Sequence, residues 1–349
     1  MMEEQISRDE FGARQAEMSA RWYENVQRTH GDVEAYIATR WEAYLDRWRE
    51  AARFMRDGDE ILDIGGGNIY PMLIDFLKEK NFRYNYLDVD PSCVDASRDQ
   101  AHARGLTNST FNHGYNDKLD YRDRQFAAIF SSHCIEHSID LSKTFSELNR
   151  VLADNGNLLM AVPFGWEENP EHPYFFGPQE WVTLVIDAGF RIRVAQIGCE
   201  YPEYGYDYFI AAQKTHAGSV SRINPSDYLK TSFDFMPSKD ERITYFGKTD
   251  QKHDHVITYG DRWSINIEVP ADATEVLPVL NRHDWSGIVE VRWGDSVIIE
   301  DLYSWFAYVQ PVRIRKDAPG IGNVVTITGR GRSPTSYSNQ GVLYGVMYR

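Results

Sequence analysis

The chain has little of several features that mark particular classes of protein. Its 349 residues contain only three cysteines, Cys93, Cys134 and Cys199, and no Cys-x-x-Cys pair. Few cysteines in odd number argue against a disulfide framework and fit a reducing compartment. The acidic N-terminus does not resemble a signal peptide, and no apolar run reaches the roughly 18 residues of a membrane span. These absences predict a cytoplasmic protein without a membrane-spanning helix.

Positive charge is also scarce. The chain carries 37 Lys and Arg against 52 Asp and Glu, a formal net charge of -15. Such an excess of negative charge repels phosphate backbones, so we expect no nucleic-acid partner. The length fits two domains, because domains commonly hold roughly 100–200 residues.

The first two thirds of the chain alternate between helical and extended patterns. Residues 8–56 show apolar side chains at three- and four-residue spacing, which predicts helices. Further helices are predicted at 70–80, 91–104, 140–152 and 178–188. Strands are predicted at 60–64, 84–89, 109–113, 126–131, 157–162, 190–197 and 206–212. This alternation predicts an α/β domain with a mostly parallel sheet and helices on both faces.

The pattern changes after about residue 217. Short β-branched segments such as 264–269, 287–293, 297–300 and 324–328 follow one another without helical stretches between them. They predict a C-terminal antiparallel β-sandwich or jelly roll. The expected organisation is an N-terminal helical cap (1–56), a cofactor-binding domain (57–216) and a β domain (217–349), with a linker at 215–227.

A glycine-rich loop follows the first predicted strand. Ile61–Ile64 leads into Gly65, Gly66 and Gly67, where a chain without Cβ atoms can turn sharply and approach a ligand. A dinucleotide fingerprint would require a third glycine at position 70, which is Tyr. The loop therefore favours a ligand without phosphates, such as S-adenosylmethionine.

An acidic pair ends the next predicted strand. Asp88 and Asp90 lie in Tyr86–Pro91, and a carboxylate there can accept hydrogen bonds from both ribose hydroxyls. Strand alternation puts both on one face and cannot choose between them. Asp90 is the better candidate because it lies nearer the carboxyl tip of the strand.

Several further segments complete a resemblance to a known family. The chain from about 57 to 214 resembles class I S-adenosylmethionine-dependent methyltransferases of the ubiquinone-biosynthesis-like kind, which have a Rossmann-like sheet. The resemblance lies in Ile61–Gly67, Tyr86–Ser92, Phe126–His137, Leu148–Pro163 and Pro178–Phe190.

This resemblance implies roles for individual residues. Asp63 and Gly65–Gly67 would surround the methionine portion of the cofactor, and Asp90 would hold its ribose. Tyr115 and Asn116, in the turn after the third strand, would reach the adenine, and Ser132 is a further candidate contact. The chain departs from the family pattern at Ile69, where a third glycine is usual, and at Tyr115 or Asn116, where an acid is often found.

A histidine–glutamate–histidine cluster follows the fourth predicted strand. His133, Glu136 and His137 would share one face if this stretch were a helical turn. Three interpretations stay open: a structural cap for the next helix, a general base that removes a hydroxyl proton, or a divalent metal site. Some relatives carry Glu-x-x-Glu-His here and use it for a metal, whereas this chain has His133 in place of the first Glu.

His172 is a further catalytic candidate, because it follows the fifth strand and such loops line the ligand crevice. A turn made rigid by Pro170 and Pro173 is the alternative interpretation.

The β domain is rich in aromatic residues, including Trp263, Trp285, Trp293, Trp305, Phe306 and Tyr308. Core packing, sugar stacking and self-association are the uses open to such side chains. The combination of domains resembles some bacterial enzymes that methylate sugars or polysaccharide ends. We therefore expect an O-methyltransferase whose acceptor is a hydroxyl of a sugar or glycan, oriented by the β domain. A small-metabolite methyltransferase and a non-catalytic assembly protein are the alternatives.

Overall fold

The computed structural model describes residues 7–67, 69–168, 172–201, 205–216, 218, 222–316 and 322–349. The chain divides into two compact units, residues 1–163 with 178–225 and residues 164–177 with 226–349. The chain thus leaves the first unit after residue 163, contributes a short segment to the second and returns. Residue 217, where we expected the β domain to begin, lies outside the described residues.

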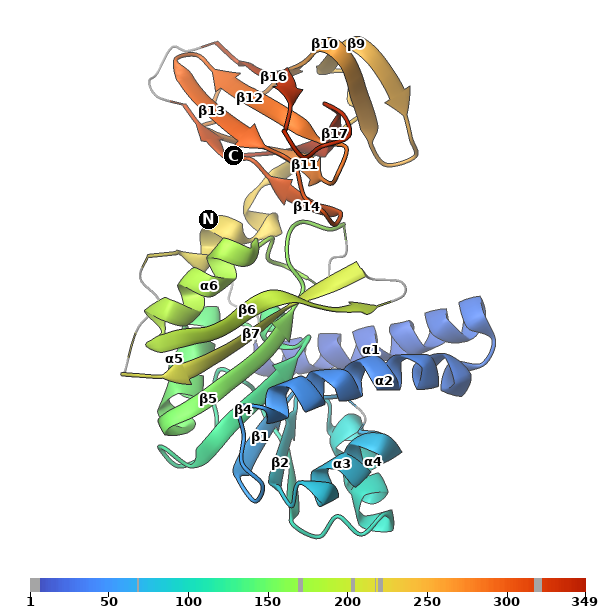
Figure 1. Cartoon of the computed structure of the whole chain (residues 1–349), viewed down its shortest axis with the longest axis vertical. Coiled ribbons are helices and arrows are strands. Elements are labelled where there is room, and N and C mark those ends of the chain that lie inside the picture. Colours follow the sequence, from blue (N-terminus) through green and yellow to red (C-terminus); the bar gives the residue numbers. More distant parts are fainter. Residues whose placement is uncertain are drawn as a thin grey trace. The chain divides into compact units, whose positions relative to one another are not determined.

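The first unit contains a seven-stranded sheet in the order β3-β2-β1-β4-β5-β7-β6 (Figure 1). Neighbouring strands from β3 to β5 are parallel, and β7 runs antiparallel to both β5 and β6. The predicted Rossmann-like α/β fold is confirmed. The elements are α1 Arg8–His30, α2 Val33–Ala52, β1 Glu60–Ile64, α3 Pro71–Glu79, β2 Arg83–Asp88, α4 Pro91–Ala103, β3 Ser109–His113, β4 Phe126–Ser132, the 3₁₀ turn η1 Ile135–His137, α5 Leu141–Val151, β5 Leu152–Val162, α6 Pro178–Asp187, β6 Phe190–Tyr201 and β7 Gly205–Lys214.

Local signals in the sequence set several helix boundaries. The Asp90 side chain accepts a hydrogen bond from the Ser92 N–H at the start of α4, and Asp140 does the same for Lys143 at the start of α5. Pro91 follows the first cap, where a missing N–H costs nothing. Strand β5 begins five residues earlier than the predicted strand, because Leu152 pairs with Phe126 before a shift in register.

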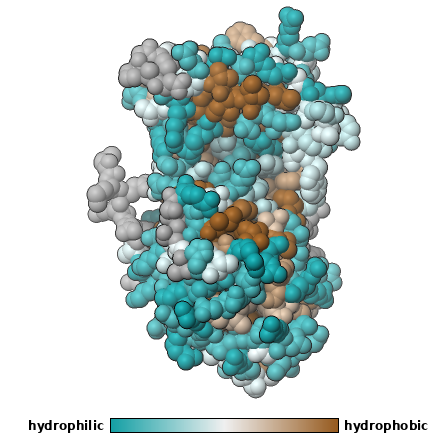
Figure 2. Space-filling model, turned by 60° about the vertical axis from the view of Figure 1, so that its left-hand side comes forward, coloured by the Kyte–Doolittle hydropathy of each residue, from teal (hydrophilic) through white to brown (hydrophobic). Residues whose placement is uncertain are grey.

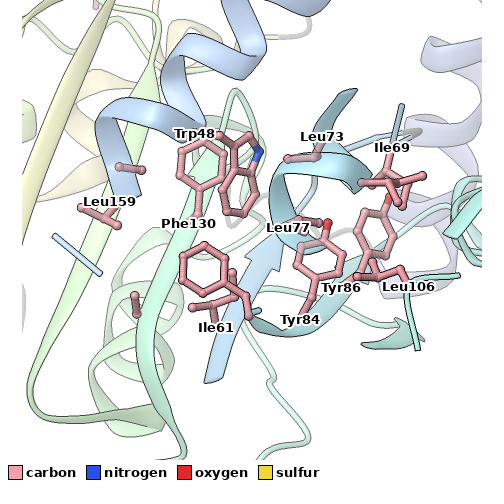
Figure 3. Packing of buried hydrophobic residues seen from close by; sticks show 14 of the residues in the cluster. Trp48, Ile61, Ile69, Leu73, Leu77, Tyr84, Tyr86, Leu106, Phe130 and Leu159 are labelled. Carbon is pink, nitrogen blue, oxygen red and sulfur yellow. The ribbon is translucent and has the colours of Figure 1, made fainter. Parts of the chain in front are cut away.

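Helices α2, α3 and α4 pack on one face of this sheet. Trp48 of α2 lies against Phe130 of β4, with ring centroids 4.2 Å apart, and also contacts Tyr84 of β2 (Figure 3). Leu73 and Leu77 of α3 belong to the same buried cluster. N-terminal helix α2 is therefore part of the core that supports the sheet.

The carboxyl ends of the central strands meet at one edge. Ile64, the last residue of β1, pairs with Leu87 of β2 and with Ser131 of β4. Because β7 is antiparallel, its beginning lies at the same edge, where Tyr208 pairs with Val162 at the end of β5. Side chains at the start of β7 can therefore join those at the ends of the parallel strands.

The second unit is an antiparallel β domain, as predicted. Its ten strands form one hydrogen-bonded sheet. A β-sandwich or jelly roll was predicted; the separate antiparallel β domain is confirmed, and a jelly roll is not established. The elements are β8 Asp234–Pro237, β9 Ile243–Gln251, β10 Val256–Glu268, β11 Glu275–Arg282, β12 Gly287–Trp293, β13 Ser296–Asp301, β14 Tyr308–Pro311, β15 Ile314–Arg315, β16 Val324–Arg332 and β17 Gly341–Tyr348, preceded by the short turns η2 Pro225–Tyr228 and η3 Lys230–Ser232.

Strand β10 connects two parts of this hydrogen-bonded sheet. Its first residues, Val256–Thr258, pair with β17, whereas Ser264–Glu268 pair with β16. An irregularity lies between Tyr259 and Ser264, and such irregularities let a strand pass from one layer to another. Side chains from strands on the β16 side and on the β17 side of β10 then pack together in one buried core. Its members include Ile265, Val291, Leu280 and Val346.

The visible surface is mostly hydrophilic and is interrupted by a few hydrophobic areas (Figure 2). Within the described residues, no helix has the length and apolar character needed to cross a bilayer. Cys93 and Cys134 are free thiols, and the side chain of Cys199 is outside the described set.

We predict that Trp48→Ala lowers the free energy of unfolding of the first unit by about 3–5 kcal/mol, because it leaves a cavity between α2 and the sheet. Ile186→Ala on α6 removes a partly exposed side chain and should cost under about 0.5 kcal/mol. Urea unfolding followed by circular dichroism would measure both. Equal costs for the two variants would contradict the packing described for α2.

Candidate active site

The glycine-rich loop turns directly after β1. Gly65 and Gly67 have φ values of 70° and 60°, a region that favours glycine. The Gly65 N–H donates to the Leu87 carbonyl at 2.8 Å, and a Cβ on Gly65 would collide with the Cys134 side chain. A Cβ on Gly67 would meet no atom of the described residues within 4 Å. The loop therefore exposes backbone at Gly67, where a ligand could approach closely.

Asp63 lies buried beneath this loop. Its Oδ2 accepts a 2.6 Å hydrogen bond from the Tyr84 hydroxyl, whereas its Oδ1 accepts none from the described residues. Burial raises the pKa of Asp63 to about 7, against the lowering effect of the Tyr84 hydrogen bond. An ionised Asp63 is consequently short of a positive partner.

The two acidic residues at and just after the end of β2, Asp88 and Asp90, make different contacts. Asp88 is the last residue of β2, and its carboxylate accepts hydrogen bonds from the Gly67 N–H at 3.2 Å and the Tyr86 hydroxyl at 2.9 Å. Asp90 is beyond the strand, at the N-cap of α4, so strand alternation does not govern its direction. Asp88 holds the glycine loop, which leaves Asp90 as the ribose candidate.

Asp90 uses mainly one of its two oxygens. Oδ1 accepts from the Ser92 N–H at 2.8 Å and from its hydroxyl at 2.7 Å, whereas Oδ2 has a thiol contact with Cys93 at 3.6 Å. A carboxylate oxygen can accept more than one hydrogen bond. Oδ2 therefore has capacity for ligand hydroxyls.

The turn after β3 is tied to other parts of the first unit. The Tyr115 hydroxyl donates to the Arg8 carbonyl at 2.9 Å, and the Asn116 amide donates to the Ser138 hydroxyl at 2.9 Å. Asp117 pairs with Arg8 through Oδ2, while its buried Oδ1 accepts no hydrogen bond from the described residues. Asp117 is therefore a further candidate at this turn, next to the two residues predicted for the adenine.

The end of β4 has an unusual backbone conformation. His133 has a φ of 51°, which is strained for a residue with a side chain. Its N–H donates to the Ala161 carbonyl at 2.8 Å, which holds it at the edge of the sheet. The preceding Ser132 has a buried hydroxyl without a hydrogen bond to the described residues.

The histidine–glutamate–histidine cluster follows at once and is not a turn of α-helix. Only Ile135–His137 form a 3₁₀ turn, so the condition under which His133 and His137 would share a helical face is not met. The two imidazoles still meet at Glu136: His133 Nδ1 and His137 Nε2 each lie 3.8 Å from its Oε1. Glu136 is buried, and neither carboxylate oxygen accepts a hydrogen bond from the described residues.

A buried ion pair borders His133 on its other side. Arg47 of α2 donates through Nε to Asp207 Oδ2 at 2.6 Å and through a second nitrogen to Oδ1, and both side chains are almost fully buried. Asp207 Oδ2 lies 3.7 Å from His133 Nε2. His133 is thus flanked by Asp207 and Glu136, one carboxylate near each ring nitrogen.

The remaining catalytic candidate, His172, belongs to the second unit. Its Nδ1 contacts the Glu167 carboxylate within the segment 164–177. Residues 169–171, which precede it, lie outside the described residues. The structure thus brings together Asp63, the glycine loop, Asp88 and Asp90 around β1 and β2, and His133, Glu136 and His137 after β4.

The sequence analysis did not single out Arg47, Tyr84 and Asp207 of this site. Each lies in a helix or a strand of the first unit and pairs with a residue that is distant in the sequence. A buried polar side chain must find a partner, but the polar residues around Arg47 in α2 and around Tyr84 in β2 gave no local signal that these side chains are buried.

We predict that Arg47→Met destabilises the first unit by about 3–5 kcal/mol, because it leaves Asp207 buried without a counter-charge. The double variant Arg47→Met/Asp207→Leu should recover much of that loss, since it removes both charges. Urea unfolding would measure the difference. A double variant no more stable than Arg47→Met would contradict the conclusion that the loss comes from leaving Asp207 buried without its counter-charge.

Residues 34–195 match the family model described as "Methyltransferase domain". The chain is 26% identical over 140 residues to "Putative methyltransferase YrhH" of Bacillus subtilis, which covers 39% of this chain and 71% of that protein. It is also 26% identical over 119 residues to "Uncharacterized protein YafE" of Escherichia coli, which covers 30% of this chain and 58% of that protein.

Two solved structures illustrate the structural similarity. A SAM-dependent methyltransferase from Aquifex aeolicus has a TM-score of 0.41 at 20% identity, covering 48% of this chain and 89% of that one. Phosphoethanolamine N-methyltransferase 2 of Haemonchus contortus, in complex with S-adenosyl-L-methionine, has a TM-score of 0.44 at 16% identity, covering 56% and 60%. The family match extends from α2 to β6 and indicates that the chain is an enzyme, with a segment similar to methyltransferase domains.

Proposed function

We propose that the chain is an O-methyltransferase of the ubiquinone-biosynthesis-like type that acts on a hydroxyl of a sugar or glycan. The observation that carries this proposal is the position of His133 between two buried carboxylates at the carboxyl edge of the sheet. A hydroxyl acceptor must lose a proton during methylation, and an imidazole is suited to take it near neutral pH.

The residues near the glycine loop fit S-adenosylmethionine. This cofactor carries positive charge and supplies an electrophilic methyl group on its sulfonium. Asp63 offers a buried carboxylate oxygen without a hydrogen bond, and a cationic ligand would stabilise the ionised form of that group. Gly67 presents open backbone beside it. We propose that Asp63 and Gly65–Gly67 surround the methionine portion.

Other residues would hold the nucleoside. Asp90 has an oxygen with capacity for the ribose hydroxyls, while Asp88 keeps the Gly67 N–H in place. Tyr115 and Asn116 are the candidates for the adenine side, and Ser132 for a further contact through its unbonded hydroxyl. Asp117 joins this set because its Oδ1 is similarly unbonded.

His133 is the proposed proton acceptor. When it takes a proton from an acceptor hydroxyl, the resulting imidazolium is stabilised by Glu136 and Asp207, at 3.8 Å and 3.7 Å from its two nitrogens. Arg47 holds the Asp207 carboxylate in place through two hydrogen bonds. Asp207 and Glu136 are therefore positioning residues rather than proton acceptors.

His137 and a metal ion are the competing assignments for this cluster. His137 shares Glu136 with His133, so either imidazole could accept the proton. The unbonded Glu136 oxygens, with His133 and His137, also have the chemistry of a divalent-metal site. Elemental analysis of the protein, followed by an activity measurement after chelation, separates the metal interpretation from the general-base interpretation. Unchanged activity after chelation would exclude a role for a metal ion.

The acceptor class distinguishes the remaining alternatives. A small-metabolite methyltransferase would turn over monosaccharide-sized acceptors as fast as longer glycans. His172, in the second unit, is a catalytic candidate only if the segment 164–177 takes part in acceptor binding. Mass-shift screening of an acceptor panel with labelled cofactor would compare these classes directly.

We predict that S-adenosylmethionine binds more tightly as pH rises from about 6 to 8. Free Asp63 is largely neutral below its pKa of about 7, so binding of the cation at lower pH must expel a proton. Calorimetry in two buffers of different protonation enthalpy would detect that release. Asp63→Asn should weaken binding and abolish the pH dependence.

Asp75→Asn, which changes an exposed aspartate of α3, is the matched control for that experiment. It should bind the cofactor like the unmodified chain, with the same pH dependence. A pH-dependent affinity that survives in Asp63→Asn would contradict the role given to this carboxylate.

We predict that His133→Gln lowers kcat by about 10²–10⁴-fold while cofactor affinity stays within about twofold. His102→Gln, on the exposed side of α4, should leave both unchanged. Steady-state methyl transfer and calorimetry would provide the two readouts. A larger loss of kcat in His137→Gln than in His133→Gln would transfer the role to His137.

A further inference from the structure

Two exposed aromatic rings lie together at one end of the β domain. Trp285, between β11 and β12, is 49% exposed, and Tyr337, between β16 and β17, is 69% exposed. Their ring centroids are 5.7 Å apart at an interplanar angle of 45°. In contrast, Trp263 and Trp293 of the same unit are buried in its core. Core packing therefore accounts for those tryptophans and not for this pair.

The backbone beneath the pair is firmly held. The Tyr337 N–H donates to the Asp284 carbonyl at 2.8 Å, and the Gln340 N–H donates to the Trp285 carbonyl at 3.1 Å. The buried Ser336 hydroxyl also donates to the Asp284 carbonyl, at 3.0 Å. The two loops are thus fixed to each other, so the rings form a preorganised surface that we call the aromatic platform.

A third loop extends this end of the domain. The Ser304 N–H donates to the His283 carbonyl at 3.3 Å, and Trp305 beside it is 65% exposed. Exposed aromatic side chains grouped on hydrogen-bonded loops are unusual on a soluble surface, and such groups commonly mark binding sites. The platform therefore needs an occupant.

Size and charge select the kind of occupant. Two rings exposed to this extent offer roughly 200–250 Å², far below the approximately 800 Å² per partner of a stable protein interface. The net charge of -15 opposes nucleic acids and anionic membranes. The small area and the negative charge together favour a small neutral ligand with flat apolar faces and hydroxyl groups at its rim. A sugar ring has those properties.

Polar groups for such a rim lie beside the rings. His283 Nδ1 accepts the Trp285 N–H at 3.1 Å, which leaves Nε2 as the N–H donor of the neutral ring. Burial lowers the pKa of His283, so the ring is neutral at physiological pH. The partly exposed Asp284 carboxylate lies on the same loop and can accept from hydroxyls.

We propose that the aromatic platform of Trp285 and Tyr337, with His283 and Asp284 at its rim, is a binding site for a neutral glycan chain. One ring would stack on each of two sugar units, and the rim would bond their hydroxyls. The platform stands on its own geometry; only the assignment of its ligand as the methyl acceptor rests on the proposed function.

Binding to the full chain tests this proposal without any methyl transfer. Calorimetry would use four neutral polysaccharides (dextran, mannan, galactan and xyloglucan), with heparin as the anionic comparison. At least one neutral polysaccharide should bind, and Trp285→Ala and Tyr337→Ala should each weaken it about tenfold or more. Trp285→Tyr, which keeps a ring, should retain most of the affinity.

Phe246→Ala is the matched control, because Phe246 of β9 is 48% exposed and makes no ring contact with the described residues. It should leave glycan affinity unchanged. Failure of all four polysaccharides to bind, tighter binding of heparin, or equal weakening by Phe246→Ala would overturn the proposal. So would sedimentation in which Trp285→Ala dissociates a dimer, since the rings would then serve self-association.

The same measurements keep the two proposals apart. A chain that binds a neutral glycan through Trp285 and methylates none of those tested supports the platform and contradicts the proposed function. If the chain methylates a sugar hydroxyl, shows no binding at the platform and keeps its KM in Trp285→Ala, the proposed function is supported and the platform proposal is contradicted.

Discussion

The buried ion pair between Arg47 and Asp207 connects the architecture of the first unit to its chemistry. It joins α2 to the start of β7, and it can do so only because β7 is antiparallel and begins at the carboxyl edge of the parallel strands. There Asp207 lies 3.7 Å from His133, whose strained backbone points its imidazole between two carboxylates. A pair of charges this deeply buried is costly to separate, so α2, β7 and His133 are held as one arrangement.

Around the glycine-rich loop, which is the proposed cofactor site, buried polar side chains are also held by specific partners. Here the contacts are hydrogen bonds and not an ion pair. Asp88 holds the Gly67 N–H, Tyr84 holds one oxygen of Asp63, and Asp90 starts α4. These contacts fix the loop, and Asp63 Oδ1 accepts no hydrogen bond from the part of the chain that the structure describes. Burial makes the ionised form of Asp63 unfavourable in the free protein, and a cationic ligand removes that disadvantage. This charge effect would favour a positively charged cofactor, as the proposed function requires.

Local patterns predicted most of the first unit, because alternation, glycines and caps such as Asp90 and Asp140 act within a few residues. They also placed Gly65–Gly67, His133, Glu136 and His137 at the sheet edge. They failed where partners are distant, as for Arg47 and Asp207, and they did not indicate the left-handed backbone of His133. In the β domain, local patterns predicted a series of antiparallel strands but not which strands pair. The pairing depends on the change of partner within β10, which no local pattern encodes.

The identity of the atom that receives the methyl group is the most direct test of the proposed function, in which His133, between Asp207 and Glu136, takes a proton from a hydroxyl. The measurement is incubation of the full chain with isotopically labelled S-adenosylmethionine and the acceptor identified by screening, followed by linkage analysis of the product. The account predicts a labelled methyl ether on a sugar oxygen. A label found on nitrogen, carbon or sulfur, or on an acceptor without a sugar, would contradict it.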